Sequence, residues 1–195
     1  MLLLSSAGRS WLLACARRAL EAAGRGEDMA PAQLPPTLSD SDRCELERRL
    51  AAFVSLHKHG ALRCCVGHTG FDIPLHQVVP EMAQAAARDD TRFAPVSSDE
   101  VPDIQLEISV LSPFFPIRPD EVVPGTHGLM VRQGPLRGLL LPQVATLYQW
   151  DSDRFLRETC RKAGLSPDAW KHGATLEAFT TEIIAETGTK AELAS

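Results

Sequence analysis

The stretch FVSLHKHGALRCCVG, residues 53–67, decides the fold class of this chain. Its two ends, residues 53–57 and 62–67, are rich in β-branched, aromatic and apolar residues, which is typical of strands. The tetrapeptide KHGA between them is typical of a tight turn, because glycine tolerates the backbone conformations that turns require. The stretch therefore predicts a β-hairpin.

The length of the turn sets the register of this predicted hairpin. An even-numbered turn pairs Leu56 with Arg63 and Val54 with Cys65, and it places these four side chains on one face of the hairpin. The opposite face then carries Ser55, His57 and Cys64.

Other segments add strands to this hairpin. Residues 104–110, IQLEISV, alternate strictly between apolar and polar, which predicts a strand with one core face and one polar face. Short apolar runs at 129–131 and 139–141 flank the tripeptide QGP and predict a second hairpin. Residues 175–184 fit either a helix or a strand, and their β-branched and aromatic residues favour a strand.

Apolar residues recur at helical spacing near the N-terminus. Leu12, Ala16 and Leu20 form one stripe after Ser10, a candidate N-cap. We prefer this amphipathic helix to a secretion signal, because no basic residue precedes the first leucines and polar residues interrupt the apolar run. Further helices are predicted after Pro74, Pro142 and Asp151, whereas residues 24–46 read as a Pro-rich connector and residues 186–195 as a loose tail.

The order of these elements indicates the fold class. Helices that do not alternate regularly with strands are typical of α+β proteins. We therefore expect an α+β fold with a largely antiparallel β-sheet flanked by helices, in one domain over residues 1–195.

Composition excludes several classes of protein. The chain has 195 residues, 44% of them hydrophobic, and a net charge of −5, which disfavours nucleic-acid binding. No apolar run approaches the length that a membrane helix needs, so no membrane association is expected. Five cysteines without a CxxC pair indicate a reducing, cytoplasmic compartment. Walker, GxGxxG, GxSxG, HExxH and CxxxCxxC motifs are missing, and neither a cofactor nor a metal is predicted.

The segment LRCCVG at residues 62–67 resembles the LRGCIG motif of the AMMECR domain family, also called AmmeMemoRadiSam system protein A. Several other segments follow in the family's order, and the resemblance covers about residues 8–184. These segments are FVSLHK (53–58), PL (74–75), DTRF (90–93), EISVL (107–111), HG (127–128) and LPQVA (141–145).

The resemblance implies an antiparallel sheet flanked by helices and built from both chain ends. It also implies a smaller subdomain, roughly 68–103, with a cleft between the two parts. It implies no activity, because the biochemical function of the family is not established. The family's genes lie beside genes for a Memo-like protein and a radical-SAM protein, which makes these two proteins the expected partners. Cys64 departs from the family, which has glycine there.

Cys65 occupies the family's cysteine position. It is a candidate nucleophile or soft metal ligand, since the charge of nearby Arg63 would favour the thiolate. His127 and Glu107 are the candidate bases. The alternative is that Cys65 is a small buried residue of a strand, as most free cysteines are.

Three polar residues are candidates for ligand binding. Arg63 and Arg92 have the geometry to bind a small anionic ligand through bidentate contacts, and Gln143 lies near a predicted helix start. The alternative for the arginines is a structural ion pair with Glu107 or an aspartate. Two hypotheses follow: a ligand- or protein-binding module, or an enzyme that uses Cys65 on a small anionic substrate.

Overall fold

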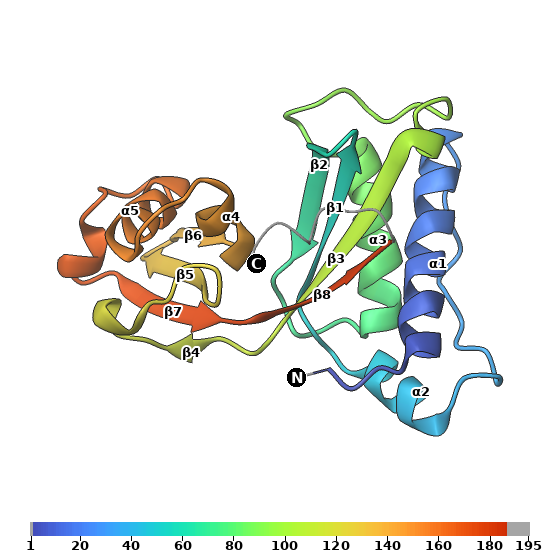
Figure 1. Ribbon diagram of the computed structural model, residues 1–195, viewed down its shortest axis with the longest axis horizontal. Coiled ribbons are helices and arrows are strands. Elements are labelled where there is room, and N and C mark those ends of the chain that lie inside the picture. Colours follow the sequence, from blue (N-terminus) through green and yellow to red (C-terminus); the bar gives the residue numbers. More distant parts are fainter. Residues whose placement is uncertain (1, 187–195) are drawn as a thin grey trace. The chain divides into compact units, whose positions relative to one another are not determined.

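The computed structural model describes residues 2–186, and its fold is α+β, as the sequence predicts (Figure 1). Within this part of the chain the strands form two four-stranded antiparallel sheets instead of the single sheet expected. The chain divides accordingly into a first unit, residues 2–110 with 182–186, and a second unit, Leu111–Thr181. Residues 68–103, predicted as a smaller subdomain, lie inside the first unit, and the cleft stays a prediction. Residues 187–195 of the predicted tail lie outside the described residues.

The first unit is a sheet covered on one face by two helices (Figure 1). Its strand order is β2-β1-β3-β8, and the packed helices are α1 and α3. Apolar side chains of both layers meet in one core, so burial of the helix stripes stabilises the sheet. The bounds are α1 (Ser6–Gly24), β1 (Ala52–Lys58), β2 (Ala61–His68), α3 (Leu75–Arg88), β3 (Ile104–Leu111) and β8 (Thr181–Ala185).

Helix α1 confirms the amphipathic helix that the sequence predicts. Leu12, Ala16 and Leu20 are fully buried in the core of the first unit. The helix begins earlier than predicted, because Ser5 and not Ser10 is the N-cap, and the Ser5 hydroxyl accepts a hydrogen bond from the Gly8 N–H. None of the helices within residues 2–186 combines the length and the hydropathy that crossing a bilayer requires.

The predicted connector at 24–46 contains the start of a helix, α2 (Asp40–Glu47), which the sequence analysis missed. Ser39 caps it by accepting a hydrogen bond from the Asp42 N–H. Only Asp42 and Leu46 are buried on this short helix, so it has almost no apolar stripe to reveal it.

The hairpin is confirmed, but its predicted register is wrong for most of its length. His57 pairs with Leu62 as predicted, whereas Leu56 pairs with Cys64 and Ser55 with Cys65. The shift lies between Leu56 and His57 and leaves Arg63 as an extra residue on β2. Because side chains alternate between the two faces of a strand, this single residue exchanges the environments of the two adjacent cysteines.

The second unit contains the other sheet, with strand order β4-β7-β5-β6. The predicted strand at 175–184 is two strands separated at Thr180: β7 belongs to this sheet and β8 to the first. The ring of Phe179 lies across its partner Gly128, where a side chain would collide with it. The bounds are β4 (Phe115–Pro116), β5 (Gly128–Gln133), β6 (Leu136–Leu140), α4 (Pro142–Leu147), α5 (Ser152–Lys162) and β7 (Thr175–Phe179).

Candidate functional site

Three polar side chains form a row across the middle of the first sheet. Ser55 on the central strand β1 pairs with Cys65 on β2 and with Glu107 on β3. The Ser55 hydroxyl donates a hydrogen bond to Cys65 Sγ at 3.2 Å. Paired residues project to the same side of a sheet, so two of the predicted site residues, Cys65 and Glu107, share one face with Ser55 between them.

The polar face of β3 is not open to solvent, as a polar strand face often is. Glu107 is 9% exposed and Ser109 is fully buried. On the same face of β1, the Nε2 atom of His57 is buried and has no hydrogen-bond partner among the residues described. A glutamate is rarely this buried, and a buried polar atom without a partner calls for an explanation, so we take this face as the candidate functional site.

The Cys65 thiol is half-buried, and it is not activated. Burial raises the pKa of this thiol more than the hydrogen bond from Ser55 lowers it. Cys65 is therefore a protonated thiol near neutral pH, whereas a nucleophilic cysteine normally has a lowered pKa. Within residues 2–186, no three His, Cys, Asp or Glu side chains gather closely enough to hold a metal ion.

Arg92 is held in place by Asp90. Its guanidinium contacts both carboxylate oxygens, with distances of 2.8 Å from Nε to Oδ1 and 2.6 Å from Nη2 to Oδ2. The same carboxylate accepts the backbone N–H of Cys65 at 2.8 Å, and Arg92 donates to the Cys65 carbonyl at 3.2 Å. The two side chains thus fix the backbone of Cys65, and the Arg92 guanidinium beside Asp90 lowers the pKa of that carboxyl to about 2.

Arg63 makes a similar connection to Glu100. Its Nε and Nη2 atoms each lie 3.2 Å from a carboxylate oxygen of Glu100, which also accepts from Lys58 at 3.1 Å. The hydrogen bonds from Arg63 and Lys58 lower the pKa of Glu100 to about 2. Both arginines therefore form ion pairs: Arg92 pairs with an aspartate, Asp90, as the structural alternative expected, and Arg63 pairs with Glu100, a partner that the sequence did not indicate.

The two guanidinium groups lie near the same aromatic ring. Arg63 Cζ lies 5.8 Å and Arg92 Cζ 5.3 Å from the ring centroid of Phe93, within the range of a cation–π interaction. The Phe93 side chain remains 37% exposed. We call these three residues the Phe93 patch.

The other two predicted site residues belong to the second unit. His127 precedes β5, where its Nδ1 accepts the Val123 N–H at 3.1 Å and its ring meets Phe115 edge to face. Gln143 is the second residue of α4. The other predicted site residues, Arg63, Cys65, Arg92 and Glu107, all belong to the first unit.

Sequence reasoning missed Ser55 and Asp90 as parts of the site. Ser55 was assigned to the face of Cys64, because the extra residue at Arg63 leaves no mark on the amino-acid pattern. Asp90 lies two residues before Arg92 in the segment DTRF, and this spacing could have indicated an ion pair between the two side chains.

The register predicts different consequences for the two cysteines. Cys64 is 1% exposed in the apolar core, and its Sγ accepts a hydrogen bond from Arg63 Nη1 at 3.3 Å. Cys64→Ser should lower the free energy of unfolding by about 1 kcal/mol, because a hydroxyl is more costly to bury among apolar side chains than a thiol. Cys65→Ser keeps Ser55 as a partner and should cost less than about 0.5 kcal/mol. Urea denaturation of both variants measures the difference, and a larger loss for Cys65→Ser would contradict the assignment.

Comparison with known proteins gives chain-length matches. The AMMECR1 family model matches residues 13–184. A protein of Methanothermobacter thermautotrophicus is 40% identical over 185 residues, covering 91% of this chain and 93% of its own length. A Pyrococcus furiosus protein is 40% identical over 193 residues, with 90% and 87% covered. The crystal structure of an uncharacterized protein from Pyrococcus horikoshii matches with a TM-score of 0.85 and 34% identity, covering 94% of each chain.

Proposed function

The chain belongs to the AMMECR1 family, and we propose that it is a binding module that works with Memo-like and radical-SAM partner proteins. The Phe93 patch is the observation that carries the proposal. An exposed aromatic ring in contact with two arginines has the composition of an interface hot spot. Because Asp90 and Glu100 hold both guanidinium groups, little side-chain entropy is lost when a partner docks there.

The ion pairs also favour a protein partner over a small anionic ligand. An anion would have to compete with Asp90 and Glu100 for the guanidinium groups. Those carboxylates are largely buried, with side-chain exposures of 5% and 23%, and separating them from the arginines is unfavourable. A protein surface can pack on the Phe93 ring while both ion pairs stay intact.

Sedimentation velocity of the chain with the purified Memo-like and radical-SAM proteins of the same organism tests the proposal. We expect a complex with at least one of them and a Kd raised at least tenfold by Phe93→Ala. Phe115→Ala in the second unit is the matched control, because Phe115 is 38% exposed, and it should leave the Kd within twofold. Absence of any complex with either protein would overturn the proposal.

A second candidate function is a thiol enzyme that uses Cys65. The observation in its favour is the hydrogen bond from Ser55 to Cys65 Sγ, with Glu107 next in the same row as a base. Alkylation with iodoacetamide, read by mass spectrometry, distinguishes the two candidates, and exposed Cys44 serves as an internal reference. A binding module predicts slower alkylation at Cys65 than at Cys44 at pH 7. Faster alkylation at Cys65, with an apparent pKa well below about 8.5, would favour the enzyme.

A further inference from the structure

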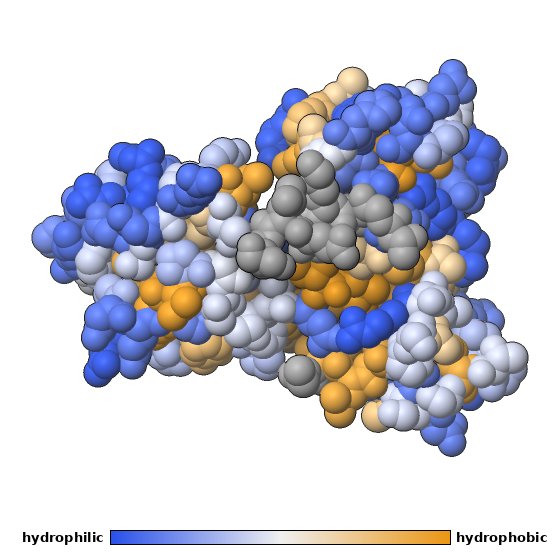
Figure 2. Space-filling model, in the orientation of Figure 1, coloured by the Kyte–Doolittle hydropathy of each residue, from blue (hydrophilic) through white to orange (hydrophobic). Residues whose placement is uncertain are grey.

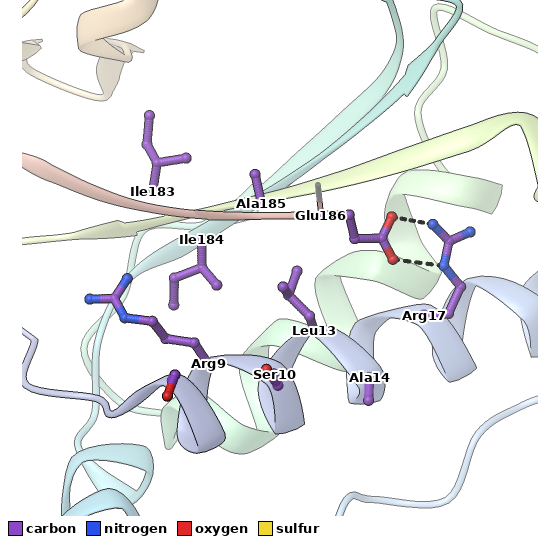
Figure 3. Close-up of a pocket in the computed structure, with 10 residues that line it drawn as sticks. Arg9, Ser10, Leu13, Ala14, Arg17, Ile183, Ile184, Ala185 and Glu186 are labelled. Atoms are coloured by element: carbon purple, nitrogen blue, oxygen red, sulfur yellow. Dashed lines mark hydrogen bonds and ion pairs between the residues drawn. The ribbon is translucent and has the colours of Figure 1, made fainter. Parts of the chain in front are cut away.

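A groove of about 630 Å³ lies between helix α1 and strand β8 of the first unit (Figure 3). Its walls are apolar or small: Leu13 and Ala14 come from the helix, and Ile184 points from the strand toward the helix. Ile183, on the strand, is 37% exposed. On the face seen in Figure 2, a hydrophobic patch lies where Figure 1 places β8. The groove is far from the Phe93 patch in sequence and shares no residue with it.

Each end of the groove is closed by an ion pair between the helix and the C-terminal strand segment. Arg9 pairs with Glu182, and Arg17 pairs with Glu186 (Figure 3 draws the second pair). Arg17 also donates to the Ile104 carbonyl at 2.7 Å, which fixes its position. These charged side chains of the groove are neutralised by each other. A segment that binds in the groove therefore needs no charge of its own.

Strand β8 lies at the edge of its sheet. The Glu186 N–H donates to the Leu106 carbonyl at 3.1 Å, so the main-chain groups of Glu186 face β3. Those of Glu182 and Ile184, which alternate with it, face β3 as well. Main-chain groups of an antiparallel strand alternate in direction, so those of Thr181, Ile183 and Ala185 face away from β3, where no described strand pairs with them. An open edge of this kind is a template for another strand.

The dimensions of the groove fit a short strand. β8 has five residues, which span about 17 Å at about 3.4 Å each. The helix residues that line the groove run from Ser6 to Arg17, and they span a similar length at about 1.5 Å each. The ion pairs Arg9–Glu182 and Arg17–Glu186 therefore mark the two ends of a site for about five extended residues.

We propose that this groove binds an extended, uncharged segment of a partner protein, which adds as a fifth strand beside β8 and places small apolar side chains against α1. Main-chain hydrogen bonds to Thr181, Ile183 and Ala185 supply the affinity, and the small residues of α1 supply the specificity. This inference rests on the proposed function, because the segment comes from the Memo-like or the radical-SAM protein.

Ile183→Pro is the test variant. Proline removes the middle one of the three amides that face away from β3 and leaves the pairing with β3 intact, which is why edge strands tolerate it. Ala14→Gln enlarges an exposed side chain of α1 that lines the groove, and Ile183→Val is the matched control that keeps the amide. Sedimentation velocity with each purified partner should give a Kd raised at least tenfold for Ile183→Pro and for Ala14→Gln, and within twofold for Ile183→Val.

Amide hydrogen exchange of the full chain, free and with each partner, shows whether the partner pairs with the open edge of β8. Exchange at Thr181, Ile183 and Ala185 should be fast in the free chain and at least tenfold slower with saturating partner. Complexes that form with unchanged Kd in both groove variants would overturn the inference and leave the proposed function standing, whereas no complex with the parent chain would overturn both.

Two further outcomes would assign the groove to another occupant and overturn the inference. Slow exchange at these three amides in the free monomer would mean that the chain itself fills the groove. A dimer of the parent chain that Ile183→Pro converts to a monomer would mean that a second copy fills it.

Discussion

Acidification from about pH 5 to about pH 1 is expected to remove about 4 kcal/mol from the free energy of unfolding through two carboxylates. The hydrogen bonds of Arg92 lower the pKa of Asp90 to about 2, and those of Arg63 and Lys58 do the same for Glu100. Each lowered pKa corresponds to at least about 2 kcal/mol, and the contribution of Glu100 is discounted because its side chain is 23% exposed.

The sign of this dependence follows from the direction of the two shifts. A carboxyl whose pKa is lower in the folded chain binds fewer protons there than in the unfolded chain. Its stabilising contribution is therefore fully present above its unfolded pKa, near about 4, and is lost as the pH falls through about 2. Urea denaturation at a series of pH values measures the loss.

The double variant Asp90→Asn with Glu100→Gln isolates the effect. It should lose most of the 4 kcal/mol already at about pH 7 and should vary much less with pH than the parent chain. Asp28→Asn is the matched control, because Asp28 also pairs with an arginine but is 91% exposed, and such pairs contribute little. Parallel pH curves for the parent and the double variant would contradict the assignment to Asp90 and Glu100.

The fold was predictable where periodicity is strong. The strict alternation of residues 104–110 gave β3, and the stripe of Leu12, Ala16 and Leu20 gave α1, because these patterns survive in any arrangement that buries one face. The division into two sheets was not predictable, because residues 175–184 carry one continuous β pattern. Only tertiary contacts assign its two halves, around Thr180, to different sheets.

The candidate site was predictable in its members and not in its geometry. Cys65, Glu107, Arg63 and Arg92 could be chosen by residue type and family position. Their relations depend on the extra residue at Arg63, which is a backbone feature without a side-chain signature. For the same reason the sequence placed Ser55 with the wrong cysteine.

Gly138 is the position in the second unit where one added carbon is expected to do most damage. It lies in β6, opposite Val131, and the end of α5 packs directly against it. A Cβ atom there would lie 2.3 Å from the backbone nitrogen of Ala163 and 2.7 Å from its Cα. These are main-chain atoms, so no rotamer change relieves the collision, and β6 and α5 must separate.

Two effects oppose each other in Gly138→Ala. Alanine restricts the unfolded chain and fits a strand better than glycine, which favours the variant by about 0.5–1 kcal/mol. Forced overpacking opposes it by about 3 kcal/mol, because the Ala163 N–H is fixed by hydrogen bonds to the Thr159 and Cys160 carbonyls. We therefore expect a net loss of about 2 kcal/mol in the free energy of unfolding, measured by urea denaturation.

Second variants test whether the collision is the cause. Ala163→Gly removes the Cβ of Ala163, which would lie 2.8 Å from the new methyl group, but leaves the closer backbone nitrogen in place. Combined with Gly138→Ala, it should restore only part of the lost stability. Leu136→Ala is the control in the same strand, since Leu136 is 44% exposed and should lose less than about 1 kcal/mol. A Gly138→Ala chain as stable as the parent would mean that α5 does not press on β6 at this point.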